Sequence, residues 1–381
     1  MDRRKSILIP TSGSYQNATA LVIYTQNIIK SLNSIKDDSL KPQIILYHDN
    51  ETPIDEFKKI NYPHIFYFNF KNDVPFIKRV INLISRKLLN RNIFKTYSQK
   101  VDYVFPALPD NSFVEAEELI FWKADFQEKY LPIFFTANDI NYSESFFTTL
   151  LDYKQSTLVL SSQDAYKSFK QFYPNHQNPV FVLPFVSFLK IKAFDFHSIK
   201  EKFQIQKPYY IVCNQFWPHK NHIRVLEAIS QLKSKELPFQ IVFTGNTSSY
   251  RNKNIFNDLK DFIEKNQLTN DIIITGFIDR DEQIALIKNA IAVVQPSYFE
   301  GWSTVIEDAK ALNKYVIASN INVNVEQINK DCTFFNPDDA EELANILTQF
   351  DIKRIDNDRK YDEDIRQFSE KLIKLFRLNE A

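Results

Sequence analysis

Residues 209–244 read YYIVCNQFWPHKNHIRVLEAISQLKSKELPFQIVFT. Tyr209–Cys213 and Gln240–Thr244 are short runs rich in apolar residues, as is typical of strands buried on both faces. Asn221–Lys233 lies between them and places apolar residues at helical spacing. A strand, a helix and a second strand in this order predict two neighbouring parallel strands with a crossover helix.

The same alternation continues on both sides of this stretch. Before it, the expected strands are Ile7–Pro10, Ile44–His48, His64–Phe68, Tyr103–Pro106, Leu119–Trp122, Leu158–Ser161 and Val180–Leu183. After it, the expected strands are Ile272–Thr275, Ala292–Gln295 and Tyr315–Ala318, and the expected helices are Ile255–Lys265, Asp281–Asn289, Thr304–Leu312 and Asp338–Leu347. Strands that alternate with helices predict a parallel sheet covered on both faces.

The pattern restarts after the polar segment 196–207, which indicates two domains. We therefore predict an α/β protein with two doubly wound Rossmann-like domains, residues 1–195 and 205–350, that face each other across a cleft. Residues 363–381 carry apolar side chains along one helical face, so we expect a helix that packs back on the first domain. Ligands of open α/β sheets bind at the carboxyl ends of the strands, and we expect the functional residues at these ends.

Glycine is scarce: the 381 residues include only four, where about 27 are usual. Gly276 and Gly301, the closest pair, are 25 positions apart, which excludes a dinucleotide-binding G-x-G-x-x-G and a P-loop. Gly13, Gly245, Gly276 and Gly301 each follow a predicted strand at the ligand edge. They are either tight turns or places where a ligand approaches the backbone, and the combination favours a ligand cleft.

Charge and cysteine content exclude several further classes. The 47 Lys and Arg balance the 47 Asp and Glu, so no overall field favours nucleic acid, and we expect no such partner. Two cysteines, Cys213 and Cys332, cannot build a disulfide framework or a four-cysteine zinc site, and their apolar surroundings indicate buried thiols in a reducing compartment. No run approaches 18 apolar residues, and we expect a cytoplasmic protein.

Residues 71–100 contain eight Lys and Arg but only one acid, Asp73, and apolar residues lie between them. The interpretation that we favour is a core-facing helix with a solvated basic face, which any α/β domain needs. The other interpretation is a helix that lies on an anionic membrane surface, peripheral to the inner face of the membrane. A lipid-linked acceptor would favour the second.

The sequence after Gly301 predicts an anion site. Ser303 or Thr304 can cap the next helix, and its free N–H groups suit a diphosphate. The helical pattern places Glu307 in solvent, opposite the apolar side, and Asp308 at the edge, where it can face the cleft.

Lys220 follows another strand and precedes a helix at the same edge, where its ammonium can neutralise a phosphate. Because surface lysines are common, this position alone is weak support. His219 and His222 flank it, but their spacing does not suggest a zinc site, and we expect no metal.

The segment from Glu300 to Ala309 resembles the E-x7-E signature of family 4 retaining glycosyltransferases (group 1), which have the two-domain GT-B fold. Asp308 stands in place of the second glutamate. Residues 214–222 (NQFWPHKNH) resemble the segment of that family that holds the donor diphosphate. Three further segments resemble one bacterial branch of the family: 122–135, 161–165 and 182–185. Together these segments run from about residue 118 to 350.

The resemblance implies a metal-independent, hexosyltransferase-type enzyme that transfers a sugar with retention from a nucleotide-sugar to a glycan, glycolipid or protein acceptor, in bacterial surface polysaccharide synthesis. It implies no cofactor beyond the donor substrate. Glu300 would contact the donor sugar near its reacting carbon, Lys220 would hold the diphosphate, and Gln215 stands where many relatives have an arginine with the same duty. Asp308 would bond the ribose hydroxyls, and Gly13 would let the donor phosphates approach.

The predicted catalytic residues are Glu300, Lys220 and Glu128, and the predicted donor-binding residues are Gly13, Asn214, Gln215, Gly245, Gly276, Gly301, Ser303, Thr304 and Asp308. Glu128 and Asn324 both stand where the branch commonly has histidine. These departures keep a second hypothesis open, a non-catalytic or regulatory GT-B protein that binds a nucleotide-sugar or glycan without turnover. A third, an epimerase on the same fold, would need a catalytic acid set that the sequence does not display.

Overall fold

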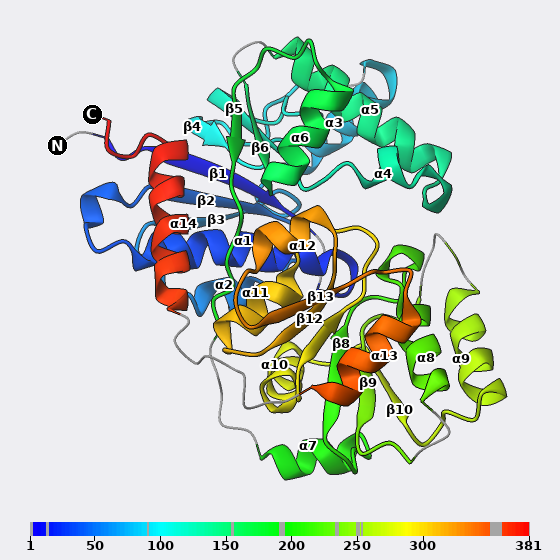
Figure 1. The fold of residues 1–381 in the computed structure, drawn as a ribbon. Coiled ribbons are helices and arrows are strands. Elements are labelled where there is room, and N and C mark those ends of the chain that lie inside the picture. Colours follow the sequence, from blue (N-terminus) through cyan, green and yellow to red (C-terminus); the bar gives the residue numbers. More distant parts are fainter. Residues whose placement is uncertain are drawn as a thin grey trace. The chain divides into compact units, whose positions relative to one another are not determined.

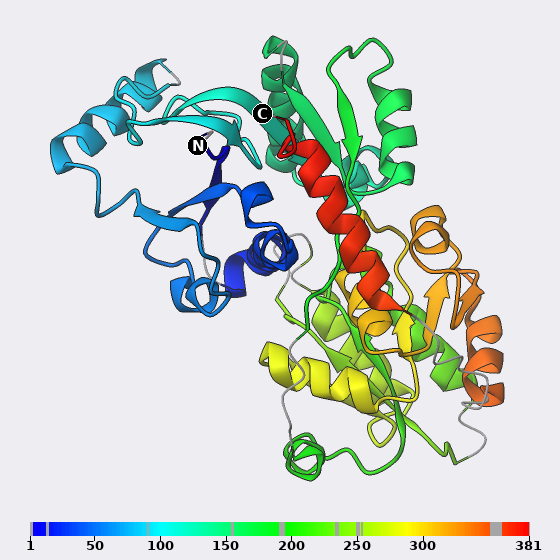
Figure 2. The same ribbon diagram turned by 90° about the vertical axis from the view of Figure 1, so that its left-hand side faces the viewer.

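The computed structural model describes residues 3–12, 15–89, 91–153, 156–189, 195–232, 236–248, 252, 254–350 and 360–380. The chain forms two compact units. Unit 1 consists of Met1–Asp125, Asn138–Val186 and Asp362–Ala381, and unit 2 consists of Phe126–Ala137 and Ser187–Tyr361. Each unit contains its own parallel sheet with helices on its faces (Figures 1 and 2).

The sheet of unit 1 has seven parallel strands in the order β3-β2-β1-β4-β5-β6-β7. Their bounds are β1 (Ser6–Thr11), β2 (Gln43–His48), β3 (Ile65–Asn69), β4 (Lys100–Val104), β5 (Glu115–Lys123), β6 (Thr157–Leu160) and β7 (Val180–Val182). The helices are α1 (Tyr15–Ser34), α2 (Ile54–Lys58), α3 (Phe76–Leu89), α5 (Ala137–Asp152), α6 (Gln163–Phe172) and α14 (Tyr361–Leu375), with a short 3-10 turn, η1 (Asp38–Leu40). The central strand β1 is buried along its whole length, as a strand covered on both faces must be.

The C-terminal helix α14 contacts unit 1 (Figure 1). The hydroxyl of Ser369 lies 2.7 Å from that of Ser31 on α1. The ring of Phe376, just after the helix, packs edge-on against Tyr103 and Phe105, with centroids 5.5 and 5.7 Å apart. The apolar face of this last segment is therefore buried on the first sheet.

The sheet of unit 2 has six parallel strands in the order β10-β9-β8-β11-β12-β13. Their bounds are β8 (Tyr209–Cys213), β9 (Gln240–Thr244), β10 (Ile272–Gly276), β11 (Val293–Gln295), β12 (Val316–Ser319) and β13 (Cys332–Phe335). The helices are α4 (Gln127–Tyr130), α7 (Phe196–Lys202), α8 (His222–Gln231), α9 (Ile255–Lys265), α10 (Arg280–Asn289), α11 (Thr304–Ala311), α12 (Asn322–Gln327) and α13 (Ala340–Gln349), with 3-10 turns η2 (Pro132–Phe134) and η3 (Pro218–Lys220). Two clusters of buried apolar residues pack this unit, and both include side chains of its strands.

The α/β class with two doubly wound sheets is confirmed, and every strand predicted from the sequence is present. Several elements were not predicted, among them α7, which lies in the segment 196–207 that was taken as polar, and two elements at one edge of unit 2. β13 (Cys332–Phe335) is an edge strand in which three of the four residues are only half-buried, and α12 (Asn322–Gln327) is a six-residue, mostly polar helix. Both close one side of the sheet of unit 2 and gain their stability from packing rather than from local pattern.

The two units differ from the expected domains 1–195 and 205–350. Phe126–Ala137, in the middle of the first expected domain, clusters with unit 2, and unit 2 already begins at Ser187. Residues 351–359, most of the charged segment that leads to α14, lie outside the described residues. Among the described residues, none of the helices is both long enough and apolar enough to cross a membrane.

Candidate active site

The loop after β8 presents Lys220 at the carboxyl end of the sheet of unit 2. Pro218–Lys220 forms one 3-10 turn, and Asn221 then adopts the left-handed conformation with φ 55° and ψ 38°. Asparagine tolerates this conformation, and its side-chain amide donates to the backbone oxygens of Pro296 and Pro337, both at 3.0 Å. The strand order reverses between β8 and β11, and ligands of open α/β sheets bind at such a point.

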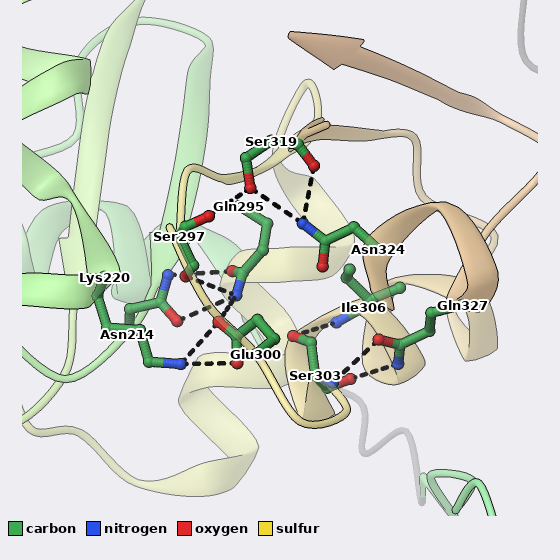
Figure 3. A network of polar contacts seen from close by, with 10 residues as sticks. All are labelled: Asn214, Lys220, Gln295, Ser297, Glu300, Ser303, Ile306, Ser319, Asn324 and Gln327. Atoms are coloured by element: carbon green, nitrogen blue, oxygen red, sulfur yellow. Dashed lines mark hydrogen bonds and ion pairs between the residues drawn. The ribbon is translucent and has the colours of Figure 1, made fainter. Parts of the chain in front are cut away.

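Glu300, on the loop after β11, meets Lys220 at this point (Figure 3). The Lys220 Nζ donates to both carboxylate oxygens of Glu300, at 2.7 and 2.8 Å. Gln295, the last residue of β11, donates from Nε2 to Glu300 Oε1 at 2.6 Å, and Asn214 in turn donates to Gln295 Oε1 at 3.0 Å. Three residues predicted for the site from two parts of the sequence, Asn214 and Lys220 from one and Glu300 from the other, thus belong to one hydrogen-bonded network.

This ion pair is largely buried, since the side chain of Glu300 is 7% exposed and that of Lys220 is 17% exposed. An ammonium group has three N–H donors, and Glu300 accepts from two of them. The third is available to an anionic ligand, while the carboxylate remains beside it to stabilise positive charge. The pair can therefore act on a molecule that carries an anionic and a developing cationic group side by side.

Ser303 caps the helix α11, as the sequence allowed. Its hydroxyl accepts from the N–H of Ile306 at 3.3 Å. Gln327 of α12 holds the same residue through its backbone, because it accepts from Ser303 N at 2.9 Å and donates to Ser303 O at 2.7 Å. Thr304 is the first helical residue and is half-buried. Figure 3 shows how this cap and the Lys220–Glu300 pair lie on the same side of the sheet.

The prediction that Glu307 lies in solvent was wrong. Its side chain is fully buried and accepts from Lys310 at 2.9 Å, from Gln327 at 3.0 Å and from the Tyr361 hydroxyl at 2.7 Å. Burial raises the pKa of Glu307, and the three donors oppose that effect. The helical pattern identified one buried side of α11 correctly, but α12 and the first residue of α14 cover the opposite side as well.

Asp308 is also fully buried instead of lying at an open edge. Its Oδ1 accepts from the hydroxyl of Ser187 at 2.7 Å and from Arg280 at 2.5 Å. Its Oδ2 has no hydrogen-bond partner among the described residues. Arg280, which is about one-third exposed, is therefore the side chain through which a ligand would meet this carboxylate.

Two of the four places where the chain passes between the units, at Ser187 and at Tyr361, are tied to the acidic pair on α11. Ser187, the first residue of unit 2 after Val186, donates its N–H to the Tyr361 hydroxyl at 2.7 Å. Tyr361, the last residue of unit 2, donates to Glu307. Since Ser187 also donates to Asp308, the two crossings and α11 form one buried hydrogen-bonded group.

The glycines have different roles. A Cβ on Gly245 would lie 2.1 Å from the backbone oxygen of Asn214, so this glycine lets two strand ends approach each other. The ligand interpretation of Gly245 is therefore unnecessary. Gly276 has a left-handed φ of 72°, and a Cβ there would meet nothing within 4 Å. Gly301 is buried, and Gly13 lies outside the described residues.

Glu128 is buried on the short helix α4, within the segment that clusters with unit 2. The neighbouring Tyr130 packs its ring against Phe299, with centroids 5.7 Å apart. Phe299 directly precedes Glu300, so α4 lies against the loop that carries the ion pair. Gln215 is half-buried in the loop after β8.

Asn324, the second residue found where histidine is common, has a packing role. It is fully buried on α12, and its amide donates to the backbone oxygen and the hydroxyl of Ser319, both at 3.0 Å. The Ser319 hydroxyl donates to the backbone oxygen of Ser297 at 2.5 Å. Asn324 thereby supports the loop that leads to Glu300.

The histidines beside Lys220 are structural as well. His222 is buried at the start of α8 and stacks on Phe216 with ring centroids 4.4 Å apart. Burial lowers the pKa of His222 to about 3, so the ring is neutral at pH 7. Burial raises the pKa of the free thiol of Cys213. Within the described ranges, no three His, Cys, Asp or Glu side chains gather as a metal site.

A cavity of about 570 Å³ lies in unit 1, at the ends of β2 and β3. Its lining includes His48, Asp49, Asp55, Glu56 and Asn69, and none of the predicted site residues. Three carboxylates in the lining make it a poor place for a diphosphate, because like charges repel.

Sequence reasoning missed four residues that build the site: Arg280, Gln295, Gln327 and Tyr361. Gln295 carried a local signal, because it is a polar residue that ends an apolar strand at the ligand edge. The other three come from distant parts of the chain: Arg280 contacts Asp308, Tyr361 contacts Glu307, and Gln327 contacts Ser303 and Glu307. No short-range sequence pattern predicts such contacts.

The profile of the family described as Glycosyl transferases group 1 matches residues 194–371. This span contains Lys220, Glu300 and all of α11. Over these residues the chain is similar to the group 1 glycosyltransferases. No curated protein sequence gives a significant match to the chain.

Solved structures of similar fold cover nearly the whole chain. A glycosyltransferase from Rickettsia africae is 18% identical with a TM-score of 0.64, and the match covers 100% of both chains. Anabaena Alr3699/HepE in complex with UDP and glucose is 13% identical with a TM-score of 0.68, over 97% of this chain and 99% of that one. WaaG, a glycosyltransferase involved in lipopolysaccharide biosynthesis, is 14% identical with a TM-score of 0.61, over 97% and 99%. These likenesses confirm the GT-B class.

Proposed function

We propose that this chain is a group 1 glycosyltransferase that transfers a hexosyl group, with retention and without a metal, from a nucleoside diphosphate sugar to a glycan, glycolipid or protein acceptor. We further propose that it acts in the cytoplasm, in the synthesis of a bacterial surface polysaccharide. The observation that carries the proposal is the buried Lys220–Glu300 pair at the point where the strand order reverses. A nucleotide-sugar donor is also consistent with the complexes of Alr3699/HepE with UDP and glucose and with UDP-glucose.

The chemistry of the pair suits the departure of a nucleoside diphosphate. As the bond from the sugar to the diphosphate breaks, negative charge grows on the leaving group and positive charge on the sugar ring. Lys220 and the N-terminus of α11 would stabilise the first, and the carboxylate of Glu300 the second. Both groups are held by hydrogen bonds before the reaction, so little reorganisation is needed.

The proposal assigns Lys220 the charge that a divalent cation supplies in metal-dependent transferases. Gln215 would add a hydrogen bond to the diphosphate from the same loop. Asp308 would receive the ribose hydroxyls, because its Oδ2 is a buried acceptor with no partner among the described residues. Since Arg280 covers this carboxylate, donor binding would require the Arg280 side chain to move.

The proposal is tested by incubating the purified chain with UDP-, GDP- and dTDP-hexoses in the presence of EDTA. We expect release of one nucleoside diphosphate, faster with cell-derived acceptor lipids, and an unchanged anomeric configuration in the product by NMR. Loss of activity with EDTA would contradict the metal-independent part, and inversion would contradict retention. Tight binding of a donor without hydrolysis or transfer would favour the non-catalytic alternative.

A further inference from the structure

Helix α3 (Phe76–Leu89) exposes its apolar side chains. Ile77 and Leu88 are 71% and 76% exposed, and Phe76 is 69% exposed. The other exposed apolar residues of this helix are Val80, Leu83, Ile84 and Leu89, and Ile93 follows just after it. In a helix that covers a core, side chains of this kind face inward. Figure 2 shows α3, in light blue, at the margin of the ribbon of unit 1.

The side of α3 that is buried is polar. Asn82 and Ser85 are 2% and 3% exposed. Asn82 donates to the backbone oxygen of Phe94 at 2.8 Å and accepts from its N–H at 2.9 Å. The hydroxyl of Ser85 donates to the backbone oxygen of Arg91 at 2.9 Å. Polar bonds therefore anchor α3 to the chain that follows it, and its apolar side points away from unit 1.

The favoured interpretation of 71–100 as a core-facing helix was therefore wrong. The periodicity shows that α3 has an apolar side and a polar side, but it does not show which of the two faces the protein. Asn82 and Ser85 determine that orientation, through partners that lie outside the helix.

Basic residues border the apolar side. At about 100° per residue, Lys87 falls within the apolar arc, and Arg79 and Arg86 fall at one edge of it. The guanidinium of Arg79 lies over the ring of Phe76, 5.6 Å from its centroid, so its apolar stem follows the same surface. Across 71–100 the only acid is Asp73, which leaves a strong local excess of positive charge.

We propose that α3 docks unit 1 on an anionic phospholipid surface. The helix would lie in the plane of the interface, with its exposed apolar residues among the acyl chains and its basic residues at the lipid phosphates. A second copy of this chain is a poorer occupant, because a symmetric contact would place the basic residues of one copy against those of the other. Nucleic acid would not use the apolar residues.

This inference does not depend on sugar transfer. Binding to a lipid surface is measured without donor or acceptor, so its failure would leave the proposed function intact, and the reverse also holds. If both hold, the docked helix would bring the enzyme to lipid-linked acceptors.

The test is co-sedimentation of the full-length protein with vesicles of phosphatidylcholine alone or of an equal mixture with phosphatidylglycerol. We expect binding to the anionic vesicles, weaker binding to the neutral ones, and a loss of affinity at high salt. The double variant Ile77→Ser/Leu88→Ser should weaken binding at least about 30-fold, because two largely exposed apolar side chains no longer enter the interface. The triple variant Arg79→Gln/Arg86→Gln/Lys87→Gln should weaken binding to anionic vesicles about 100-fold.

Ile133→Ser is the matched control, since Ile133 is 83% exposed but lies on η2 of unit 2 and is not part of α3. It should bind vesicles as the unchanged protein does. Three outcomes would overturn the proposal: no vesicle binding by the unchanged protein, equal binding by the double variant and the control, or equal binding to neutral and anionic vesicles. A concentration-dependent dimer that only the double variant abolishes, without vesicle binding, would identify a second copy as the occupant.

Discussion

Replacing Glu300 by glutamine is expected to lower kcat by about 10²–10³-fold, the scale on which loss of one positioned electrostatic group acts. Glutamine has almost the same shape, and its carbonyl oxygen can still accept from Lys220. It has no negative charge with which to stabilise the positive charge that develops on the donor sugar. The fall should therefore appear in the chemical step, measured as the release of nucleoside diphosphate at saturating donor.

Donor affinity should behave differently in this variant. In the ligand-free protein the positive charge of Lys220 is paired with the carboxylate of Glu300. In the Glu300→Gln variant no carboxylate neutralises it. The Kd for the nucleoside diphosphate, measured by calorimetry, should therefore stay constant or fall. Glu282→Gln is the matched control, because Glu282 also pairs with a lysine, Lys202, but is not among the residues assigned to the site. A kcat within threefold of that of the unchanged enzyme would show that Glu300 is not the charge that the reaction uses.

Replacing Lys220 by methionine is expected to weaken binding and chemistry together. Methionine keeps the length of the side chain but removes the cation next to the diphosphate. The loss of transition-state stabilisation should be about 2–4 kcal/mol, which corresponds to a fall of about 30- to 1000-fold in kcat/KM. The Kd for the nucleoside diphosphate should rise, in contrast to the Glu300 variant.

Two controls separate this effect from a loss of stability. Lys202→Met removes a lysine from another, more exposed ion pair and should leave both constants unchanged. Thermal unfolding of Lys220→Met should show a folded protein at the assay temperature, since Gln295 continues to donate to Glu300. If Lys220 and Glu300 act as a unit, the double variant should lose much less than the product of the two single losses. Independent, multiplicative effects would argue that the ion pair is incidental.

The fold was predictable because each of its strands and longer helices can be recognised from a short stretch of sequence. Each strand of a doubly wound sheet is a short apolar run, and each helix shows its own period, so alternation alone identifies the class. Tyr209–Cys213 and Gln240–Thr244 were placed to the residue for this reason. α12 was missed because six residues are too few to show a helical period, and β13 because it is a half-buried edge strand without a clear apolar run.

Part of the site was predictable for the same reason. Lys220 and Glu300 each follow a strand, and the carboxyl ends of parallel strands meet at one edge of the sheet. Their direct ion pair and its support by Gln295 and Asn214 could not be predicted, because these contacts depend on the side-chain positions of two different loops.

The burial of the acidic residues on α11 could not be predicted from the local sequence. The helical pattern assigned Glu307 to solvent, yet Tyr361, 54 positions along the chain, donates to it in the core. Whether a face is covered depends on elements far away in sequence. The same limit explains α3, whose two sides were recognised while their orientation was not.

A structure of the protein with an intact nucleotide-sugar tests the central claim most directly. We predict that the diphosphate lies within hydrogen-bond distance of Lys220 Nζ and of the N–H groups at the start of α11, with the anomeric carbon beside Glu300. A donor bound elsewhere, for example in the acidic cavity beside His48 in unit 1, with the Lys220–Glu300 pair unchanged, would contradict the account.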